Sequence, residues 1–188
     1  MPLLILLAIL VLALVYLVML YNQLVALKHN VVKSWSNIDV LLKQRHEELP
    51  KLVETCKQYA QFEQATLTRV MEARAAVASA RELHDLGQLG QAETRLRASL
   101  GNLIATVEAY PELKTNEHYQ HLIQRITGLE DAIADRREFY NEAVNINNVR
   151  IEQFPDVLLA KVFTFPSAQP LQFASEEKRD VDMKALFH

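Results

Sequence analysis

An uninterrupted apolar run near the start of the chain constrains its fold more than any other feature. Residues Leu3 to Tyr21 are 19 consecutive residues without a charged or amide side chain, and the phenols of Tyr16 and Tyr21 are their only polar groups. A helix of this length rises about 28 Å, close to the bilayer hydrocarbon thickness of about 30 Å. The run therefore predicts a transmembrane anchor over residues 1–21, represented by Leu3, Leu7, Leu10, Leu14, Leu17 and Tyr21.

Two other interpretations of the run are possible. A cleaved secretory signal has a basic start, a shorter apolar core and small residues at the cleavage site. Here no basic residue precedes the run, the run is longer than such a core, and no small-residue cleavage site follows it. A buried core helix is also conceivable, although a soluble domain of this size rarely encloses a helix that is apolar on every side. A retained anchor is the interpretation that the sequence favours.

The basic residues beside the run bear on its orientation. Lys28 is the first charged side chain of the chain, and Lys33 follows it. Under the positive-inside rule they favour the cytoplasmic side for everything after the anchor. We therefore expect a single-pass membrane protein with the rest of the chain on the cytoplasmic side.

The composition limits the remaining function classes. The net charge of -3 is spread without a long block of like charges, so nucleic acid is not an expected partner. Cys56 is the single cysteine and cannot form an intrachain disulfide. Four glycines and six prolines in 188 residues indicate helices joined by few turns.

Residues after the anchor carry a long apolar stripe. Its mean spacing of about 3.5 residues is typical of a helix with a mild left-handed supercoil. The pattern predicts one helix over about 22–84, with a kink near Pro50 favoured over a true break there. The stripe runs through Leu24, Leu27, Val31, Trp35, Ile38, Leu42, Arg45, Leu49, Leu52, Cys56, Tyr59, Glu63, Leu67, Val70, Arg74 and Val77.

Two further helices complete the prediction. Gly87 and Gly90 are expected to form a reversal, after which helices follow at about 89–109 and 116–152. A short strap is expected at 155–165 and a mobile tail at 166–188. The expected fold is all-α: an N-terminal transmembrane helix that continues into a long antiparallel, up-and-down helical bundle over 22–165. Because the first helix exceeds the second greatly in length, self-association could cover the excess.

Three segments, read in order, resemble the LemA family. They are "SWSNIDVLLKQRHEELPKLVETCKQYAQFE" from Ser34, "VEAYPELKTNEHYQHL" from Val107, and "RREFYNEAVNINN" from Arg136 followed by Phe154-Pro155. The resemblance implies an N-terminal anchor followed by a helical bundle. It also implies a role in bacterial membrane organisation, including magnetosome membranes, and no established enzymatic activity.

The sequence contains no clear arrangement of catalytic or metal-ligating residues. Bundle metal centres need Glu-x-x-His spacing, and no histidine of this chain has Glu three positions before it. His118 and His121 have ligand spacing on a helix, but two surface histidines are the simpler interpretation. No serine, nor Cys56, has a nucleophile elbow or an oxyanion loop nearby. We expect no catalysis, no metal and no cofactor.

Polar residues interrupt the apolar stripes instead. Long Arg side chains could snorkel, with their stems on the core and their heads in water. Alternatively they could pair with acids such as Asp39, Glu63 or Glu130 and fix bundle register or subunit choice. Trp35 could lie near the headgroups but is expected in the core. The candidates for assembly or register are Trp35, Asp39, Arg45, Glu63, Arg74, Arg136 and Arg137.

These features predict a membrane-anchored helical bundle that self-assembles as a scaffold or membrane organiser, without catalytic activity. The expected partners are the lipid bilayer and further copies of the chain. The alternative is a regulatory adaptor whose bundle binds another membrane protein, such as a protease, sensor or transporter.

Overall fold

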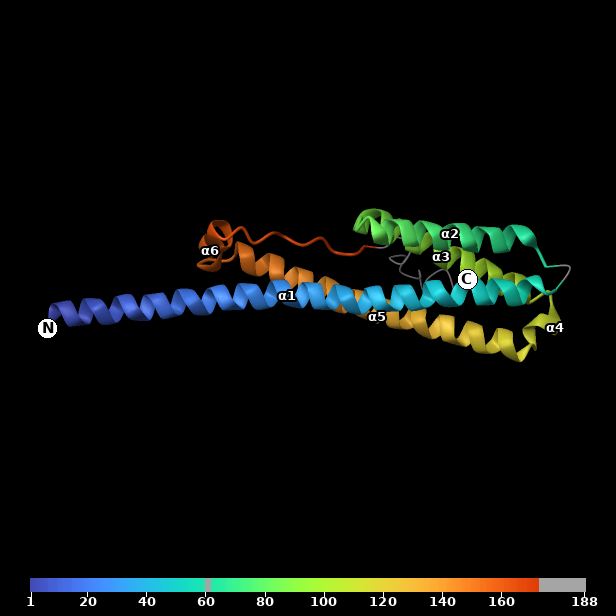
Figure 1. Cartoon of the computed structure of the whole chain (residues 1–188), viewed down its shortest axis with the longest axis horizontal. Helices are drawn as coiled ribbons and strands as arrows, with labels where there is room; N and C mark the ends of the chain where they lie inside the picture. The colour runs from blue at the N-terminus through green and yellow to red at the C-terminus, as the bar shows by residue number, and fades with distance from the viewer. Residues whose placement is uncertain (60–61, 173–188) are drawn as a thin grey trace, which may run out of the picture. The chain divides into compact units, whose positions relative to one another are not determined.

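Every regular element in residues 1–59 and 62–172, the part of the chain that the computed structural model describes, is a helix. In chain order these are α1 (Pro2–Lys57), α2 (Gln64–Glu82), α3 (Leu86–Val107), α4 (Pro111–Lys114), α5 (Glu117–Glu152) and α6 (Asp156–Val162) (Figure 1). The predicted all-α class is confirmed. The chain divides into unit 1, formed by Met1–Val40 and Ala134–Pro170, and unit 2, formed by Leu41–Ile133 and Leu171–His188.

Unit 2 is an antiparallel four-helix bundle. The second half of α1 and the first half of α5 run in opposite directions. Arg45 of α1 contacts Glu130 of α5. Glu48, which is later in α1, contacts Arg125, which is earlier in α5. Helices α2 and α3 pack along each other. Helix α2 folds back beside α1, where Arg74 contacts His46 (Figure 1). Short connections between amphipathic helices favour this up-and-down order.

The prediction of one helix over 22–84 is wrong. Helix α1 continues through Pro50 and ends at Lys57, and α2 begins at Gln64. The apolar stripe was correctly identified, but it belongs to two antiparallel helices rather than to one supercoiled helix. Its buried apolar members in unit 2 are Leu42, Leu49, Leu52 and Cys56 on α1, with Leu67, Val70 and Val77 on α2.

Two aromatic side chains hold the connection between α1 and α2. The Tyr59 hydroxyl accepts a hydrogen bond from Asn116 Nδ2 at 3.1 Å. The Phe62 side chain is buried, and its ring centroid lies 5.1 Å from that of Tyr110. These contacts exist only when the chain turns back, so tertiary packing overrides a local sequence that contains no glycine or proline between Lys57 and Gln64.

The reversal between α2 and α3 also differs from the prediction. His84 has φ 54°, in the left-handed region, and Asp85 caps the next helix by accepting from the Gln88 amide at 2.9 Å. Helix α3 therefore begins at Leu86, and Gly87 lies inside it rather than in the turn. His is one of the non-glycine residues enriched in this backbone region, which explains why the glycines were not needed.

Unit 1 is built on an antiparallel pair formed by the first part of α1 and the last part of α5. The Trp35 ring lies edge-on against the Tyr140 ring, with centroids 5.7 Å apart, and Arg150 Nη2 donates to Gln23 Oε1 at 2.8 Å. Helix α6 and the segment after it complete this unit. The buried residues are Leu20, Leu24, Ile38, Tyr140, Ala143, Val144, Asn147, Asp156 and Ala160.

The mobile tail was predicted to begin too early. Asn148 on α5 bonds both backbone groups of Ala168, with Nδ2 donating to the carbonyl at 2.8 Å and Oδ1 accepting from the amide at 2.9 Å. Leu171 is buried, with 1% of its side chain exposed. The prediction of mobility is therefore wrong for residues 166–172, and for residues 173–188 it lies outside the described part of the chain.

Candidate functional site

The first half of α1 exposes an apolar surface all round. An 18-residue window of this helix has a mean hydropathy of 3.3 and is 6% buried, so the helix is long and apolar enough to cross a membrane. A core helix would be mostly covered, and this exposure rejects that alternative. The predicted anchor residues are all exposed, namely Leu3, Leu7, Leu10, Leu14, Leu17 and Tyr21.

The exposed run ends where unit 1 begins to pack. Leu20 is 4% exposed, in contrast to Leu17 at 45%. The Tyr21 ring lies edge-on against Phe163, with centroids 4.9 Å apart, and against Phe165 at 5.9 Å. The end of the apolar run is thus fixed by aromatic contacts from the segment that follows α5.

A charged cluster lies inside unit 2. Arg45 Nη2 of α1 is 2.5 Å from Glu93 Oε1 of α3, and Arg45 Nη1 is 2.5 Å from Glu130 Oε1 of α5. Arg97 Nε donates to the other Glu130 oxygen at 3.1 Å. Two guanidinium groups and two carboxylates balance in charge, and the cluster ties three helices together at one level.

Arg45 is a fully buried side chain, at 1% exposure, so the snorkelling interpretation is wrong for this residue. Glu93 is 0% exposed. Burial raises the pKa of the Glu93 carboxyl, although the charge of Arg45 opposes that rise. Within the described residues, Arg45 Nε and Glu93 Oε2 are buried without a hydrogen-bond partner. A buried ion pair with such unpaired atoms adds little net stability, because the cost of desolvation offsets the attraction between the charges.

Arg74 connects α2 to α1 in a different way. Its Nε donates to the His46 carbonyl at 2.9 Å, and its Nη2 lies 2.6 Å from His46 Nε2. Burial lowers the pKa of His46, and the positive charges of Arg74 and Arg81 lower it further. The imidazole therefore accepts from the guanidinium in its neutral form, with the proton on Nδ1.

The other register candidates occupy more exposed positions. Glu63 is 53% exposed and accepts from Thr66 Oγ1 at 2.9 Å at the start of α2. The Arg136 guanidinium lies 5.6 Å from the centre of the Phe139 ring. Trp35, Asp39 and Arg137 are half-buried in unit 1. Of the three acids expected as Arg partners, Glu130 is the one that Arg45 contacts.

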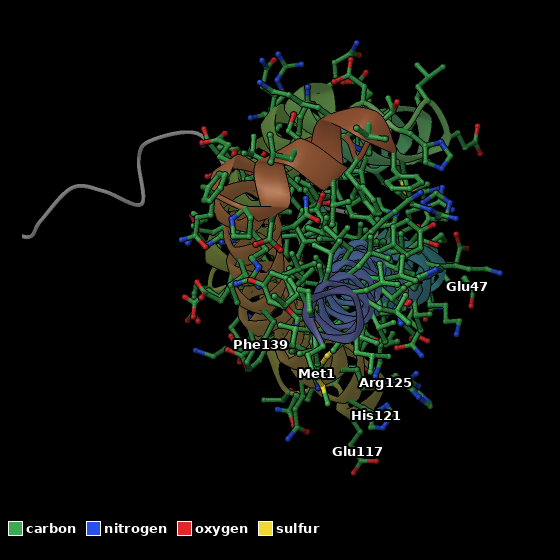
Figure 2. All side chains as sticks on the ribbon, turned by 90° about the vertical axis from the view of Figure 1, so that its left-hand side faces the viewer. Met1, Glu47, Glu117, His121, Arg125 and Phe139 are labelled. Carbon is green, nitrogen blue, oxygen red and sulfur yellow. The ribbon has the colours of Figure 1, made fainter. Side chains whose placement is uncertain are left out.

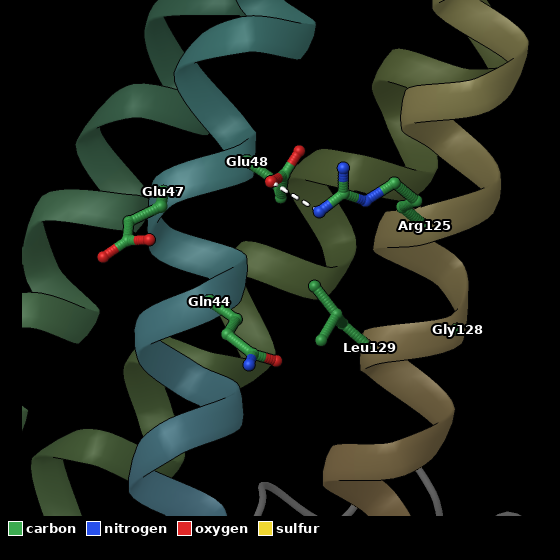
Figure 3. A pocket seen from close by; sticks show the side chains of 6 residues that line it. All are labelled: Gln44, Glu47, Glu48, Arg125, Gly128 and Leu129. Carbon is green, nitrogen blue, oxygen red and sulfur yellow. Dashed lines mark hydrogen bonds and ion pairs between the residues drawn. The ribbon is translucent and has the colours of Figure 1, made fainter.

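A polar groove of about 400 Å³ lies between α1 and α5 in unit 2 (Figure 3). Glu48 accepts there from Arg125 Nη2 at 2.9 Å and from Lys51 Nζ at 3.0 Å, and its second oxygen is buried without a partner among the described residues. The groove contains no nucleophile paired with a base. Its lining residues are Gln44, Glu47, Glu48, Arg125, Gly128 and Leu129.

Metal ligands do not gather in the described ranges 1–59 and 62–172, where no group of three or more His, Cys, Asp or Glu side chains is placed to hold an ion. His118 and His121 are both exposed near the start of α5, as expected of surface histidines. The Cys56 thiol is buried, and burial raises its pKa to about 11, far from the range of a reactive thiolate.

Sequence reasoning missed Glu93, the most deeply buried acid of the cluster. The signal was present, because Glu93 lies four residues after Leu89 and three before Leu96, within the apolar stripe of α3. It also missed Glu48 and Arg125, which the sequence alone gives no reason to pair. Their partnership depends on the antiparallel register of α1 and α5.

The sequence profile of the LemA family matches residues 34–184, most of the chain. The chain belongs to the LemA family. The resemblance of the three segments noted in the sequence is thereby confirmed. The matched range covers the buried cluster of unit 2 and the part of unit 1 from residue 34 onward.

Curated relatives of this LemA chain are magnetosome proteins. The chain is 28% identical over 179 residues to Magnetosome protein MamQ 2 of Paramagnetospirillum magneticum, and the match covers 83% of this chain and 66% of the relative. Magnetosome protein MamQ of Magnetospirillum gryphiswaldense is 27% identical over 191 residues, covering 87% of this chain and 70% of the relative. The exposed apolar helix and these relatives together support a membrane location.

Proposed function

We propose that this LemA chain is a single-pass membrane protein that self-assembles and acts as a scaffold or membrane organiser, without catalytic activity. Three observations support the proposal: the exposed apolar run of α1, the family membership, and relatives that are named as magnetosome proteins. The described residues offer a polar groove and a buried ion cluster rather than a nucleophile with a base.

The observation that carries self-assembly is an apolar stripe on the outer face of α5 in unit 1. Phe139, Ile146 and Val149 are 61%, 43% and 45% exposed, and their spacing of seven and three residues places them on one face of the helix. Exposed apolar patches of this kind mark interaction surfaces.

A second copy anchored in the same bilayer is the proposed occupant of this stripe. Anchoring confines both chains to two dimensions and aligns them, so a small apolar surface suffices for association. The earlier expectation rested on an uncovered length of the first helix. Because α2 folds back beside α1, that argument no longer holds, and the stripe on α5 replaces it.

The orientation of the bundle is part of the proposal. Lys28 and Lys33 are exposed on α1 within the first turns after the apolar run. They favour a cytoplasmic location for both units, in the inner membrane of a bacterium. A Leu83→Cys variant tests this orientation with a membrane-impermeant maleimide. Labelling in intact spheroplasts would place the bundle outside the cytoplasm, and labelling only after lysis supports the cytoplasmic location.

The experiment that tests self-assembly compares two charge substitutions. Phe139→Glu together with Ile146→Glu places carboxylates in the stripe, whereas Ile104→Glu changes another exposed apolar residue, 40% exposed, on α3. In native nanodiscs we expect oligomers for the wild type and for Ile104→Glu, and monomers for the double variant. A wild-type chain that is monomeric at micromolar concentration contradicts the proposal.

One additional result would favour the adaptor role instead. If the monomeric chain were recovered with one stoichiometric foreign membrane protein, the bundle would be a binding partner and not a scaffold subunit. The same double variant distinguishes the two cases. If the variant loses the foreign protein while the chain itself stays monomeric, the stripe is the surface that binds that protein.

A further inference from the structure

Helix α6 turns an acidic side chain inward and apolar side chains outward. Asp156 and Ala160, one turn apart, are 2% and 5% exposed on its inner face. Leu158 and Val162, also one turn apart, are 57% and 73% exposed on its outer face. The outer surface of α6 is therefore apolar apart from exposed Lys161.

The residues on both sides of α6 extend this apolar surface. Phe154, just before the helix, is 80% exposed, and Phe163, just after it, is 54% exposed. Single exposed apolar residues are common on soluble proteins, but several within ten residues of chain form a patch. Such a patch needs an occupant.

Contacts with Tyr21 place this patch at the end of the apolar run of α1. The Phe163 and Phe165 rings lie 4.9 Å and 5.9 Å from the Tyr21 ring, and Tyr21 is the last residue of the run. Tyrosine at such a position is typical of the boundary between hydrocarbon and headgroups.

A polar link fixes α6 at the same level. Arg150 of α5 donates from Nε to Asp156 Oδ1 at 2.9 Å and from Nη2 to Gln23 Oε1 at 2.8 Å. Gln23 follows Tyr21 by two residues, a rise of about 3 Å along the helix. The inner face of α6 is thus held beside the first polar turn of α1.

The direction of α6 agrees with this placement. Figure 2 views α1 along its axis from the Met1 end, so that the helix appears as rings, and the same view shows α6 from its side. Helix α6 therefore lies across α1. A helix that lies in the plane of a bilayer has this orientation relative to a helix that crosses it.

We infer that α6 is an interfacial helix that lies in the surface of the bilayer crossed by α1. Leu158, Val162 and the flanking Phe154 and Phe163 rings enter the boundary between headgroups and acyl chains. Lys161, exposed on α6, has the charge and length to reach lipid phosphates. The inference rests on the proposed anchoring by α1, because seven residues bind a membrane appreciably only when a tether keeps them at its surface.

The occupant is the bilayer rather than a second copy of the chain because the patch continues the lipid-facing surface of α1. The exposed run of α1 and the α6 patch meet where the Tyr21 ring contacts the Phe163 ring. No charged residue interrupts this surface on α1 before Lys28. Lipid that surrounds α1 at Tyr21 therefore also meets Phe163.

Depth-dependent quenching tests the inference on the full chain. In a Cys56→Ala background, a fluorophore is attached at Leu158→Cys, at Leu10→Cys in the apolar run, or at Leu83→Cys. Leu83, in unit 2, is 67% exposed, against 57% for Leu158. Each protein is reconstituted in two kinds of phosphatidylcholine vesicle, one with a lipid that carries a nitroxide just below the headgroup and one with a lipid that carries it near the end of the acyl chain. We expect the label at residue 158 to lose more than half of its fluorescence and the label at residue 83 to lose almost none.

Each outcome has a distinct meaning. Quenching at 10 but not at 158 overturns the interfacial assignment and leaves the anchor intact, and a blue-shifted but unquenched label at 158 assigns the patch to a protein contact instead. Quenching at 158 with no quenching at 10 by either lipid overturns the spanning anchor and, with it, the tether on which the interfacial assignment rests. Absence of quenching at both positions overturns both proposals.

Discussion

Arg45 Nη2 lies 2.5 Å from Glu93 Oε1, and neither side chain is more than 1% exposed. The two residues are 48 positions apart in sequence and belong to α1 and α3. Their contact, with Glu130 of α5 on the other side of the guanidinium, joins three helices at one level of unit 2. We expect this contact to oppose sliding of one helix along another, because any shift would leave a buried charge unpaired.

Arg45→Met is expected to destabilise the protein strongly. Removing the guanidinium leaves Glu93 buried without its partner, and breaking a buried pair in this way costs about 3–5 kcal/mol of unfolding free energy. Arg45→Met combined with Glu93→Met should recover more than half of that loss, since Arg97 and Glu130 remain as a neutral pair. Denaturant unfolding followed by circular dichroism in detergent measures both values.

Lys51→Met is the matched control for that experiment. Lys51 also pairs with a glutamate, but its side chain is 58% exposed, and exposed ion pairs contribute about 0–1 kcal/mol. A loss for Arg45→Met no larger than the loss for Lys51→Met would show that the cluster does not stabilise the register of the helices.

Acidification should destabilise unit 2 through His46. Burial and the charges of Arg74 and Arg81 hold the pKa of His46 below its ordinary value of 6.5, against the weaker opposing charges of Glu47 and Glu82. The unfolded chain therefore binds the proton more tightly than the folded chain. The contribution to stability is fully present above about pH 6.5 and is lost as the pH falls through the lowered pKa.

Thermal unfolding between about pH 7 and pH 5 tests this contribution. The melting temperature of the wild type should fall over that range, and His46→Gln should flatten the fall while keeping an acceptor for Arg74. His29→Gln changes an exposed histidine of α1 and should leave the fall unchanged. Equal slopes for wild type and His46→Gln would assign the pH dependence to other groups.

The Cys56 thiol should be inert in the folded protein. Burial raises its pKa to about 11, and its side chain is 0% exposed, so at about pH 8 it is protonated and shielded. Iodoacetamide is expected to modify it only after unfolding in concentrated urea, as mass spectrometry can follow. Rapid modification of the native chain would mean that the ends of α1 and α2 open readily.

Asn148→Ala should release the segment that follows α6. The substitution removes both hydrogen bonds to Ala168, each of which contributes about 1 kcal/mol. Hydrogen exchange of the Ala168 amide should accelerate, while Asn145→Ala, at an exposed position on the same helix, should leave it unchanged. Unaltered exchange in Asn148→Ala would show that Tyr140, whose hydroxyl donates to the Gln169 carbonyl at 2.8 Å, holds the segment by itself.

Much of this fold follows from local patterns in the sequence. The apolar run of α1 has a length and composition that few structures other than a membrane helix accommodate. The stripe along α1 and α2 identified most of the buried residues of these two helices, because helical periodicity reports burial directly. Helix α5, predicted at about 116–152, spans Glu117–Glu152, and Pro155 follows its end.

What the sequence could not supply depends on contacts between distant residues. The sequence between Lys57 and Gln64 has no glycine or proline. The turn there is stabilised by contacts of Tyr59 with Asn116 and of Phe62 with Tyr110. Arg45 was recognised as a polar residue in an apolar stripe, but its choice of Glu93 follows from the register of α1 against α3. The outward apolar face of α6 was hidden in a segment expected to be a simple strap.

Membrane extraction of the full-length chain tests the central claim most directly. Cells that produce the protein are lysed, and the membranes are washed with alkaline carbonate and sedimented by ultracentrifugation. If α1 crosses the bilayer, as we propose, the uncleaved chain stays in the pellet and is released only by detergent. Uncleaved full-length protein in the aqueous supernatant would contradict the account.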